Sequence, residues 1–153
     1  YTYEALSQYA LQAMEDVRQH KVTKAVEDVT FINMAVTGVL SNTTRSFKQS
    51  ALAHAVDYAI RTYFPQESKN ALHGEAVAVG LFLQLYYNQQ AEQIPPLKDL
   101  MRKMEMPLSL DALGVPSTDE NLQILEDYLI ETSRVGEDAA SRARLHEALR
   151  QLR

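Results

Sequence analysis

The chain has 153 residues, of which 46% are hydrophobic and 23% charged, a length and balance typical of one globular domain. Its net charge of −5 excludes the basic surface that electrostatic binding of nucleic acid requires. The absence of cysteine excludes disulfides and thiolate metal sites, and no apolar run is long enough to cross a bilayer. These features predict a cytoplasmic protein with neither nucleic-acid nor membrane partners.

The first part of the chain has the periodicity of two amphipathic helices. Apolar residues recur at three- and four-residue steps over 6–17, and again over 26–40 behind Thr23, a predicted N-cap. The polar run 41–44 is expected to end the second helix, because short polar side chains compete for backbone hydrogen bonds. The inner side of this helix is predicted to carry Val26, Val29, Ile32, Asn33, Val36 and Leu40.

The middle of the chain predicts two further helices. The first is expected over 47–63, ending before Pro65, because a residue that precedes proline disfavours helical geometry. The second is expected over 74–88. Its apolar residues cover nearly the whole circumference, which predicts the central buried helix of the fold.

The remaining segment continues the helical pattern. Pro95 and Pro96 are expected to open a short helix, and the prolines and glycine of 106–116 leave room for a single turn at most. Polar residues at 117–119 predict the start of another helix, which Gly136 separates from the last one. The sequence therefore predicts one all-α domain over residues 1–153, a bundle of about seven helices.

Two of the four histidines interrupt apolar settings. His54 lies among small residues over 50–56, which allow another helix to approach closely, and His73 opens the fourth helix beside Gly74. The connection between the two helices is long enough to set the imidazoles side by side. They are interpreted either as structural histidines or as two ligands of one divalent metal.

Two carboxylates lie near these histidines. Glu75 is in the first turn of its helix, where a capping role is favoured. Asp57 follows His54 by one helical turn, so its carboxylate can line a pocket or orient an imidazole. A catalytic zinc usually has three protein ligands, and iron often takes a carboxylate, so one ligand is still missing. His20 and His146 are interpreted as surface histidines.

Residues 53–56 (Ala-His-Ala-Val) and 73–80 (His-Gly-Glu-Ala-Val-Ala-Val-Gly) resemble motifs of a known superfamily. It comprises the iron-containing alcohol dehydrogenases and glycerol dehydrogenases, together with dehydroquinate synthase, and the resemblance to its C-terminal helical domain covers roughly 22–130. The resemblance implies an N-terminal α/β domain, absent from this chain, that binds NAD(P). It also implies that an alcohol or polyol substrate lies in the cleft between the domains.

Carried over to this sequence, His54 and His73 resemble two ligands of a catalytic zinc or iron. The family's third ligand is an Asp or Glu, expected before Tyr1, so the chain is interpreted as the metal-binding half of a two-domain enzyme, inactive alone. An exposed apolar surface is expected where the chain's own N-terminal domain docks, and copies of the chain could associate through it. The predicted substrate-pocket residues are Phe47, Asp57 and Tyr58.

The sequence also departs from the family pattern. Tyr58 stands where long-chain iron dehydrogenases have a further histidine, and no glycine pair occurs in 45–50. In another register, that of dehydroquinate synthase and glycerol-1-phosphate dehydrogenase, the first ligand position falls on Ser50. Three functions therefore remain open: a glycerol-like dehydrogenase half, a cyclase or phosphate-substrate dehydrogenase domain, and a non-catalytic helical interaction module.

Overall fold

The computed structural model describes residues 2–44, 51–133 and 135–153. In these ranges the protein is helical and has no strand, which confirms the predicted all-α class. The described residues form eight α-helices, of which α2 and α3 are joined through a π turn into one rod, leaving the seven helical segments that were expected. The chain divides into two compact units, residues 1–49 and 50–153. A single domain over 1–153 stays a prediction.

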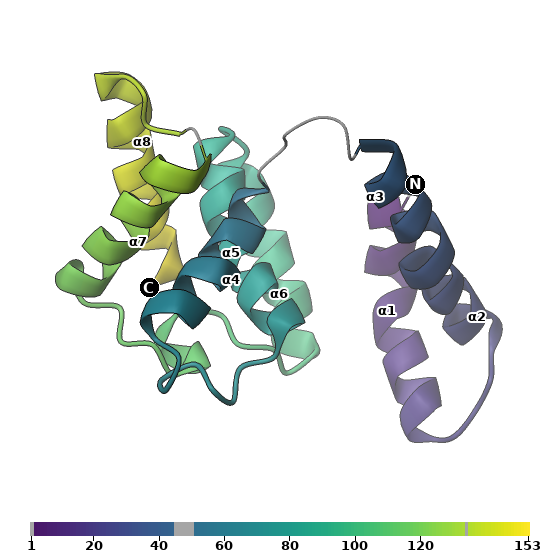
Figure 1. Cartoon of the computed structure of the whole chain (residues 1–153). Coiled ribbons are helices and arrows are strands. Elements are labelled where there is room, and N and C mark those ends of the chain that lie inside the picture. Colours follow the sequence, from purple (N-terminus) through teal and green to yellow (C-terminus); the bar gives the residue numbers. More distant parts are fainter. Residues whose placement is uncertain (1, 45–50, 134) are drawn as a thin grey trace. The chain divides into compact units, whose positions relative to one another are not determined.

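The first unit is a pair of helical segments. Helix α1 (Thr2–Arg18) contacts α2 (Lys24–Phe31), which continues through the π-helical turn η1 (Ile32–Val36) into α3 (Thr37–Thr44). Figure 1 shows α1 beside the rod formed by the other three elements. Among the residues of this unit whose side chains are described, the buried ones are Ala13, Asp16, Ala25 and Ile32.

A polar network joins the two segments of the first unit. Asp16, which is 5% exposed, accepts hydrogen bonds from Gln12 Nε2 at 2.8 Å and from Thr23 Oγ1 at 2.6 Å. Thr23 is the N-cap of α2, as predicted, and its Oγ1 accepts from the Val26 backbone N–H at 3.5 Å. One hydroxyl therefore serves both the start of α2 and a buried carboxylate of α1.

We expect Thr23→Ala to lower the free energy of unfolding by about 1–2 kcal/mol, because it removes the cap and one of the two hydrogen bonds to a buried carboxylate. Urea unfolding followed by circular dichroism measures the change. Thr23→Ser keeps the hydroxyl and is the matched control, expected within about 0.5 kcal/mol of the parent. Equal stability of the Ala and Ser variants would show that the network contributes nothing.

The second segment differs from the prediction in two ways. Residues 41–44, which were expected to break the helix, lie within α3, whose last residue is Thr44. Asn33 and Leu40, predicted on the inner side, are exposed, whereas Ile32 is 2% exposed as expected. A π turn holds one extra residue, so later positions are rotated by about 100° from the face that a regular α-helix would give them.

Large apolar side chains are exposed over much of the first unit. Val17, predicted on the inner stripe of α1, is 57% exposed, and Met34 on η1 is 76% exposed. The prediction that a partner domain or a second copy covers an apolar surface stays a prediction. Of the side chains described in this unit, the exposed large apolar ones are Tyr3, Val17, Val22, Phe31, Met34, Val39 and Leu40.

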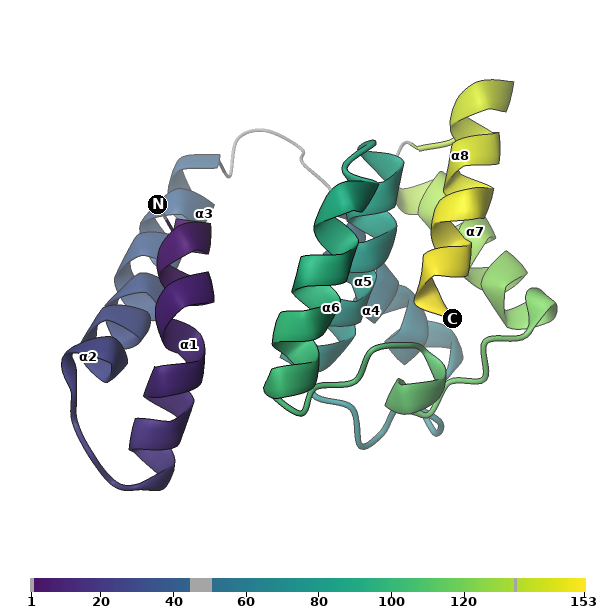
Figure 2. The same cartoon turned by 180° about the vertical axis from the view of Figure 1, so that it is seen from behind.

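The second unit is a bundle built around one central helix. Its helices are α4 (Leu52–Tyr63), α5 (His73–Tyr87), α6 (Ile94–Lys103), α7 (Asp119–Ser133) and α8 (Ala139–Leu149). Helix α5 contacts α4, α6 and α8, and Figures 1 and 2 show it between α4 and α6. The prediction of a central buried helix is confirmed, and His73 opens α5, as expected. Its buried residues are Ala76, Val79, Gly80, Phe82 and Leu83.

Short elements and caps connect the helices of this unit. The 3-10 turns η2 (Ala91–Gln93), η3 (Asp111–Leu113) and η4 (Arg150–Leu152) flank the longer helices, and the Leu110 N–H donates to the Leu152 carbonyl at 2.8 Å. This bond ties the end of the chain to the single turn predicted between α6 and α7. The prolines predicted to open α6 occupy its first turn.

The last two helices begin at polar caps. Thr118 Oγ1 accepts from the Asn121 N–H at 3.2 Å at the start of α7. Asp138 accepts from the Ser141 N–H at 2.8 Å at the start of α8, and this backbone hydrogen bond lowers the pKa of the Asp138 carboxyl. These caps confirm the predicted helix starts, because each supplies an oxygen to an otherwise unpaired N–H of the first turn.

The start of α4 differs from the prediction. The helix begins at Leu52 rather than at residue 47, because Ala51 has extended backbone angles, φ −67° and ψ 111°. Positions 47–50 lie outside the described residues. The helix ends at Tyr63, as expected from the proline that follows Phe64. None of the described helices is both long and apolar enough to span a membrane.

Candidate metal-binding site

The site depends on a close approach of α4 and α5. A Cβ atom built on Gly80 would lie 2.6 Å from the Ala53 carbonyl oxygen and 2.9 Å from the Ala53 Cα, so the two backbones are nearly in contact. The Ala53 N–H donates to Gln84 Oε1 at 3.2 Å, so a side chain of α5 pairs with the first turn of α4. The small residues around His54 therefore admit a neighbouring helix, as the sequence predicts.

The antiparallel course of these helices brings His54 and His73 together. Their ring centroids are 5.6 Å apart, and the ring planes make an angle of 55°. Both residues are exposed, and the His73 side chain retains 59% of its accessible surface. The two imidazoles, nineteen residues apart in the sequence (73 − 54 = 19), thus form one exposed pair on the second unit.

This spacing suits two ligands of one metal ion. Zinc–nitrogen bonds are about 2.0–2.1 Å, so two imidazoles bound at a tetrahedral angle have ring centroids roughly 5 Å apart. The observed separation of 5.6 Å is close to that value. The donor set, two imidazoles open to solvent, is one that zinc and iron both accept. Metal binding at His54 and His73 stays a prediction.

A buried carboxylate lies beneath the pair. Asp57 is 1% exposed, and its Oδ2 lies 2.8 Å from His73 Nδ1, while Oδ1 accepts from Arg61 Nε at 2.9 Å. Both carboxylate oxygens are therefore engaged, which offsets the desolvation of a charge in the protein interior. A histidine whose Nδ1 faces a carboxylate is held in one orientation, as ligand histidines in metal sites commonly are.

The backbone that carries His73 is held from two sides. Arg61 donates through Nη2 to the Ala71 carbonyl at 3.2 Å, and Glu75 Oε2 accepts from the Leu72 N–H at 2.8 Å. The second bond confirms the capping role predicted for Glu75. The residues just before His73 are thus anchored to α4 by Arg61 and to α5 by Glu75, which fixes where the imidazole leaves the backbone.

The three predicted pocket residues differ in burial and contacts, and one of them is outside the described residues. Asp57 has the orienting contact that was one of its two predicted roles, and its lining of a substrate pocket stays a prediction. Tyr58 is on α4 and is 57% exposed. Phe47 and the alternative ligand position Ser50 lie outside the described residues. Among the residues that the structure describes, no group of three or more His, Asp or Glu side chains could hold a metal ion, so a third ligand is not provided there.

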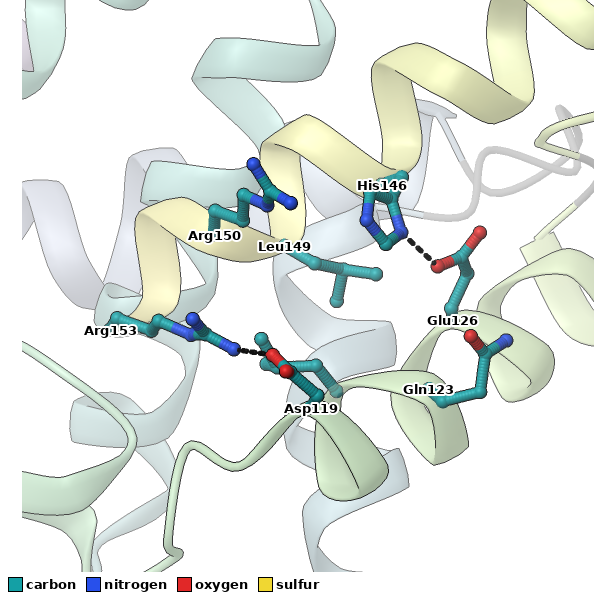
Figure 3. A pocket seen from close by; sticks show the side chains of 8 residues that line it. Asp119, Gln123, Glu126, His146, Leu149, Arg150 and Arg153 are labelled. Carbon is teal, nitrogen blue, oxygen red and sulfur yellow. Dashed lines mark hydrogen bonds and ion pairs between the residues drawn. The ribbon is translucent and has the colours of Figure 1, made fainter.

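A second imidazole–carboxylate pair lies elsewhere in the unit. His146 Nδ1 on α8 is 2.9 Å from Glu126 Oε2 on α7, and Glu126 is 6% exposed (Figure 3). The pair borders a pocket of about 290 Å³ at which Arg153 is paired with Asp119. Two ionic pairs connect to α7 here: His146 with Glu126 joins α8 to it, and Arg153 with Asp119 joins the last residue to it. His146 is exposed, as predicted, and it also bridges two helices.

Sequence reasoning missed Arg61 and the Glu126–His146 bridge. Arg61 follows Asp57 by four residues, a spacing that puts the two side chains on one helix face and could have signalled the ion pair. Glu126 and His146 are twenty residues apart (146 − 126 = 20) on different helices, and no spacing rule connects them.

Comparison with known proteins gives a partial match. No family model matches the chain. The chain is similar to glycerol dehydrogenase 1 of Schizosaccharomyces pombe, with 30% identity over 123 residues. This alignment covers 78% of the chain but 26% of the relative, so the chain spans about a quarter of that protein's length. The similarity is consistent with a fragment of a glycerol dehydrogenase, in line with the resemblance drawn from the two histidine motifs.

Proposed function

We propose that this chain is the metal-binding C-terminal part of an NAD(P)-dependent alcohol or polyol dehydrogenase and is inactive by itself. The observation that carries the proposal is the 5.6 Å separation of the His54 and His73 rings, the two histidines of the family motifs. The similarity to a glycerol dehydrogenase over 123 residues supports the same function. A third ligand and the nicotinamide site would come from chain outside the described residues.

The described residues would contribute binding and orientation. His54 and His73 would hold a zinc or iron ion, which supplies Lewis-acid chemistry toward a substrate hydroxyl when it is bound. Asp57 keeps the His73 ring in place through Nδ1. The exposure of both rings leaves the pair open to a substrate and to further ligands. Hydride acceptance belongs to the nicotinamide and to the domain that binds it.

The similarity favours a polyol dehydrogenase over the alternatives. A dehydroquinate synthase-like cyclase or a glycerol-1-phosphate dehydrogenase remains the second candidate, because the Ser50 register is the one those proteins use. The third candidate, a non-catalytic interaction module, would use His54 and His73 for structure alone. Each makes a different prediction for the metal content and the third ligand of the whole gene product.

We expect the protein made from the whole gene, including any coding region upstream of Tyr1, to contain about one zinc or iron ion per chain and to reduce NAD or NADP with glycerol or a related polyol. Metal analysis and absorbance at 340 nm measure the two properties. The 153-residue chain is the control and should show no nicotinamide reduction under the same conditions.

Different failures would select different alternatives. Turnover by the 153-residue chain alone would contradict the proposal that it is inactive by itself. A metal-containing protein with a Glu as third ligand and no polyol oxidation would favour the cyclase. A whole gene product without bound metal, and without loss of stability on treatment with a chelator, would favour the interaction module.

A further inference from the structure

We propose that Asp57, fixed by Arg61, is the positioning residue that sets the tautomer of His73, so that Nδ1 carries the proton and Nε2 is presented as the free electron pair. The expected effect of this tautomer on metal affinity rests on the proposed function. The tautomer itself is a property of the chain without metal.

The hydrogen-bond inventory determines which atom donates. Arg61 has only donors, and its Nε donates to Asp57 Oδ1 at 2.9 Å. Beside this permanent positive charge Asp57 is a carboxylate, which can only accept. The 2.8 Å contact between Asp57 Oδ2 and His73 Nδ1 therefore requires the proton on Nδ1. In the neutral ring, Nε2 is then left as the acceptor and potential ligand.

The position of Asp57 makes this contact difficult to rearrange. The carboxylate is 1% exposed, so water cannot readily replace either partner. Arg61 also donates to the Ala71 carbonyl at 3.2 Å, two residues before His73. One arginine therefore fixes both the carboxylate that meets the ring and the backbone that carries it. His73 is 59% exposed despite this, so the ring is held at its Nδ1 edge while much of its surface stays open.

Asp57→Asn is the informative substitution because asparagine has the same shape as aspartate but reverses the direction of the hydrogen bond to His73 Nδ1. Arg61 Nε still needs an acceptor, so the amide oxygen of the new side chain should face Arg61. Its NH₂ group then faces His73 Nδ1, which must accept. The neutral ring is forced into the Nε2–H tautomer, and the nitrogen that would bind metal carries a proton.

The test combines a tautomer measurement and a metal measurement on the 153-residue chain. Long-range ¹H–¹⁵N correlation spectra at pH 8, with ¹⁵N in the histidine rings, should show the Nδ1–H tautomer for His73 in the parent chain and the Nε2–H tautomer in Asp57→Asn. Calorimetric titration with zinc should give an affinity about 10–100-fold lower in the variant. Glu126→Gln is the matched control, because it alters the same kind of pair at His146, and it should leave zinc affinity unchanged.

The outcomes separate this inference from the proposed function. The Nε2–H tautomer of His73 in the parent chain would overturn the inference without any variant. So would an Asp57→Asn chain that keeps the Nδ1–H tautomer. A variant that switches to the Nε2–H tautomer and binds zinc as tightly as the parent would uphold the role of Asp57 and count against His73 as a metal ligand. The expected tautomers in a parent chain that takes up no zinc would uphold the positioning role of Asp57 and count against metal binding.

Discussion

Gly80→Ala should lower the free energy of unfolding by about 2 kcal/mol, although alanine is the better helix former. The added Cβ would lie 2.6 Å from the Ala53 carbonyl oxygen and 2.9 Å from the Ala53 Cα, which are backbone atoms that cannot rotate away. Overpacking of this kind costs about 3 kcal/mol or more when the neighbour is rigid, and the gain in helix propensity returns only about 1 kcal/mol. Urea unfolding followed by circular dichroism measures the difference.

Gly74→Ala is the matched control for this prediction. Gly74 is in the same helix, but a Cβ built there meets no atom within 4 Å. The propensity gain of up to about 1 kcal/mol should therefore appear undiminished, and the two variants should differ by about 3 kcal/mol. Two alanine variants of equal stability would show that α4 and α5 separate without cost, and that their close approach does not hold the site together.

The Gly80→Ala substitution also tests whether the close packing of α4 against α5 sets the spacing of the two imidazoles. If α4 and α5 move apart at Ala53, His54, the next residue, moves with its helix away from the start of α5. The 5.6 Å spacing of the imidazoles would then widen. A Gly80→Ala chain that still folds should bind zinc more weakly than the Gly74→Ala chain, although neither substitution touches an imidazole.

Most helices were predictable from the sequence because their periodic apolar residues lie on the buried faces of the helices. The central position of α5 followed from apolar residues around its whole circumference, and the proline-led start of α6 from the fixed backbone angle of proline. The π turn at Ile32–Val36 was not predictable in this way. It has no composition signal of its own, and it changes which later residues face inward.

The two histidines of the candidate site and part of their support were predictable, because Asp57 was expected to orient an imidazole and Glu75 to cap its helix, whereas Arg61 was missed. His54 and His73 stood out because each interrupts an apolar segment, and a family motif surrounds each. Asp57, which contacts His73, lies one turn after His54 on α4, and Arg61, one turn farther, donates to both Asp57 and the Ala71 carbonyl. Such contacts depend on the register between two antiparallel helices, which the close approach at Gly80 sets in three dimensions.

The largest effect on metal affinity is expected from removing either imidazole. His73→Ala and His54→Ala should each weaken zinc binding to the 153-residue chain by at least about 100-fold, since the loss of a direct ligand exceeds the 10–100-fold effect of an outer-shell partner. The rings lie 5.6 Å apart, so a metal held by one of them is within reach of the other. Isothermal titration calorimetry with zinc, in a buffer that does not bind the metal, measures each affinity.

His20→Ala and His146→Ala are the controls, because each removes an exposed histidine outside the pair. Both should retain the zinc affinity of the parent chain. A loss in His73→Ala without a loss in His54→Ala would move the first ligand position to Ser50 and favour the register of the cyclases. Equal affinities in all four variants would place the zinc away from both motif histidines, and the two imidazoles would then be a structural contact between α4 and α5.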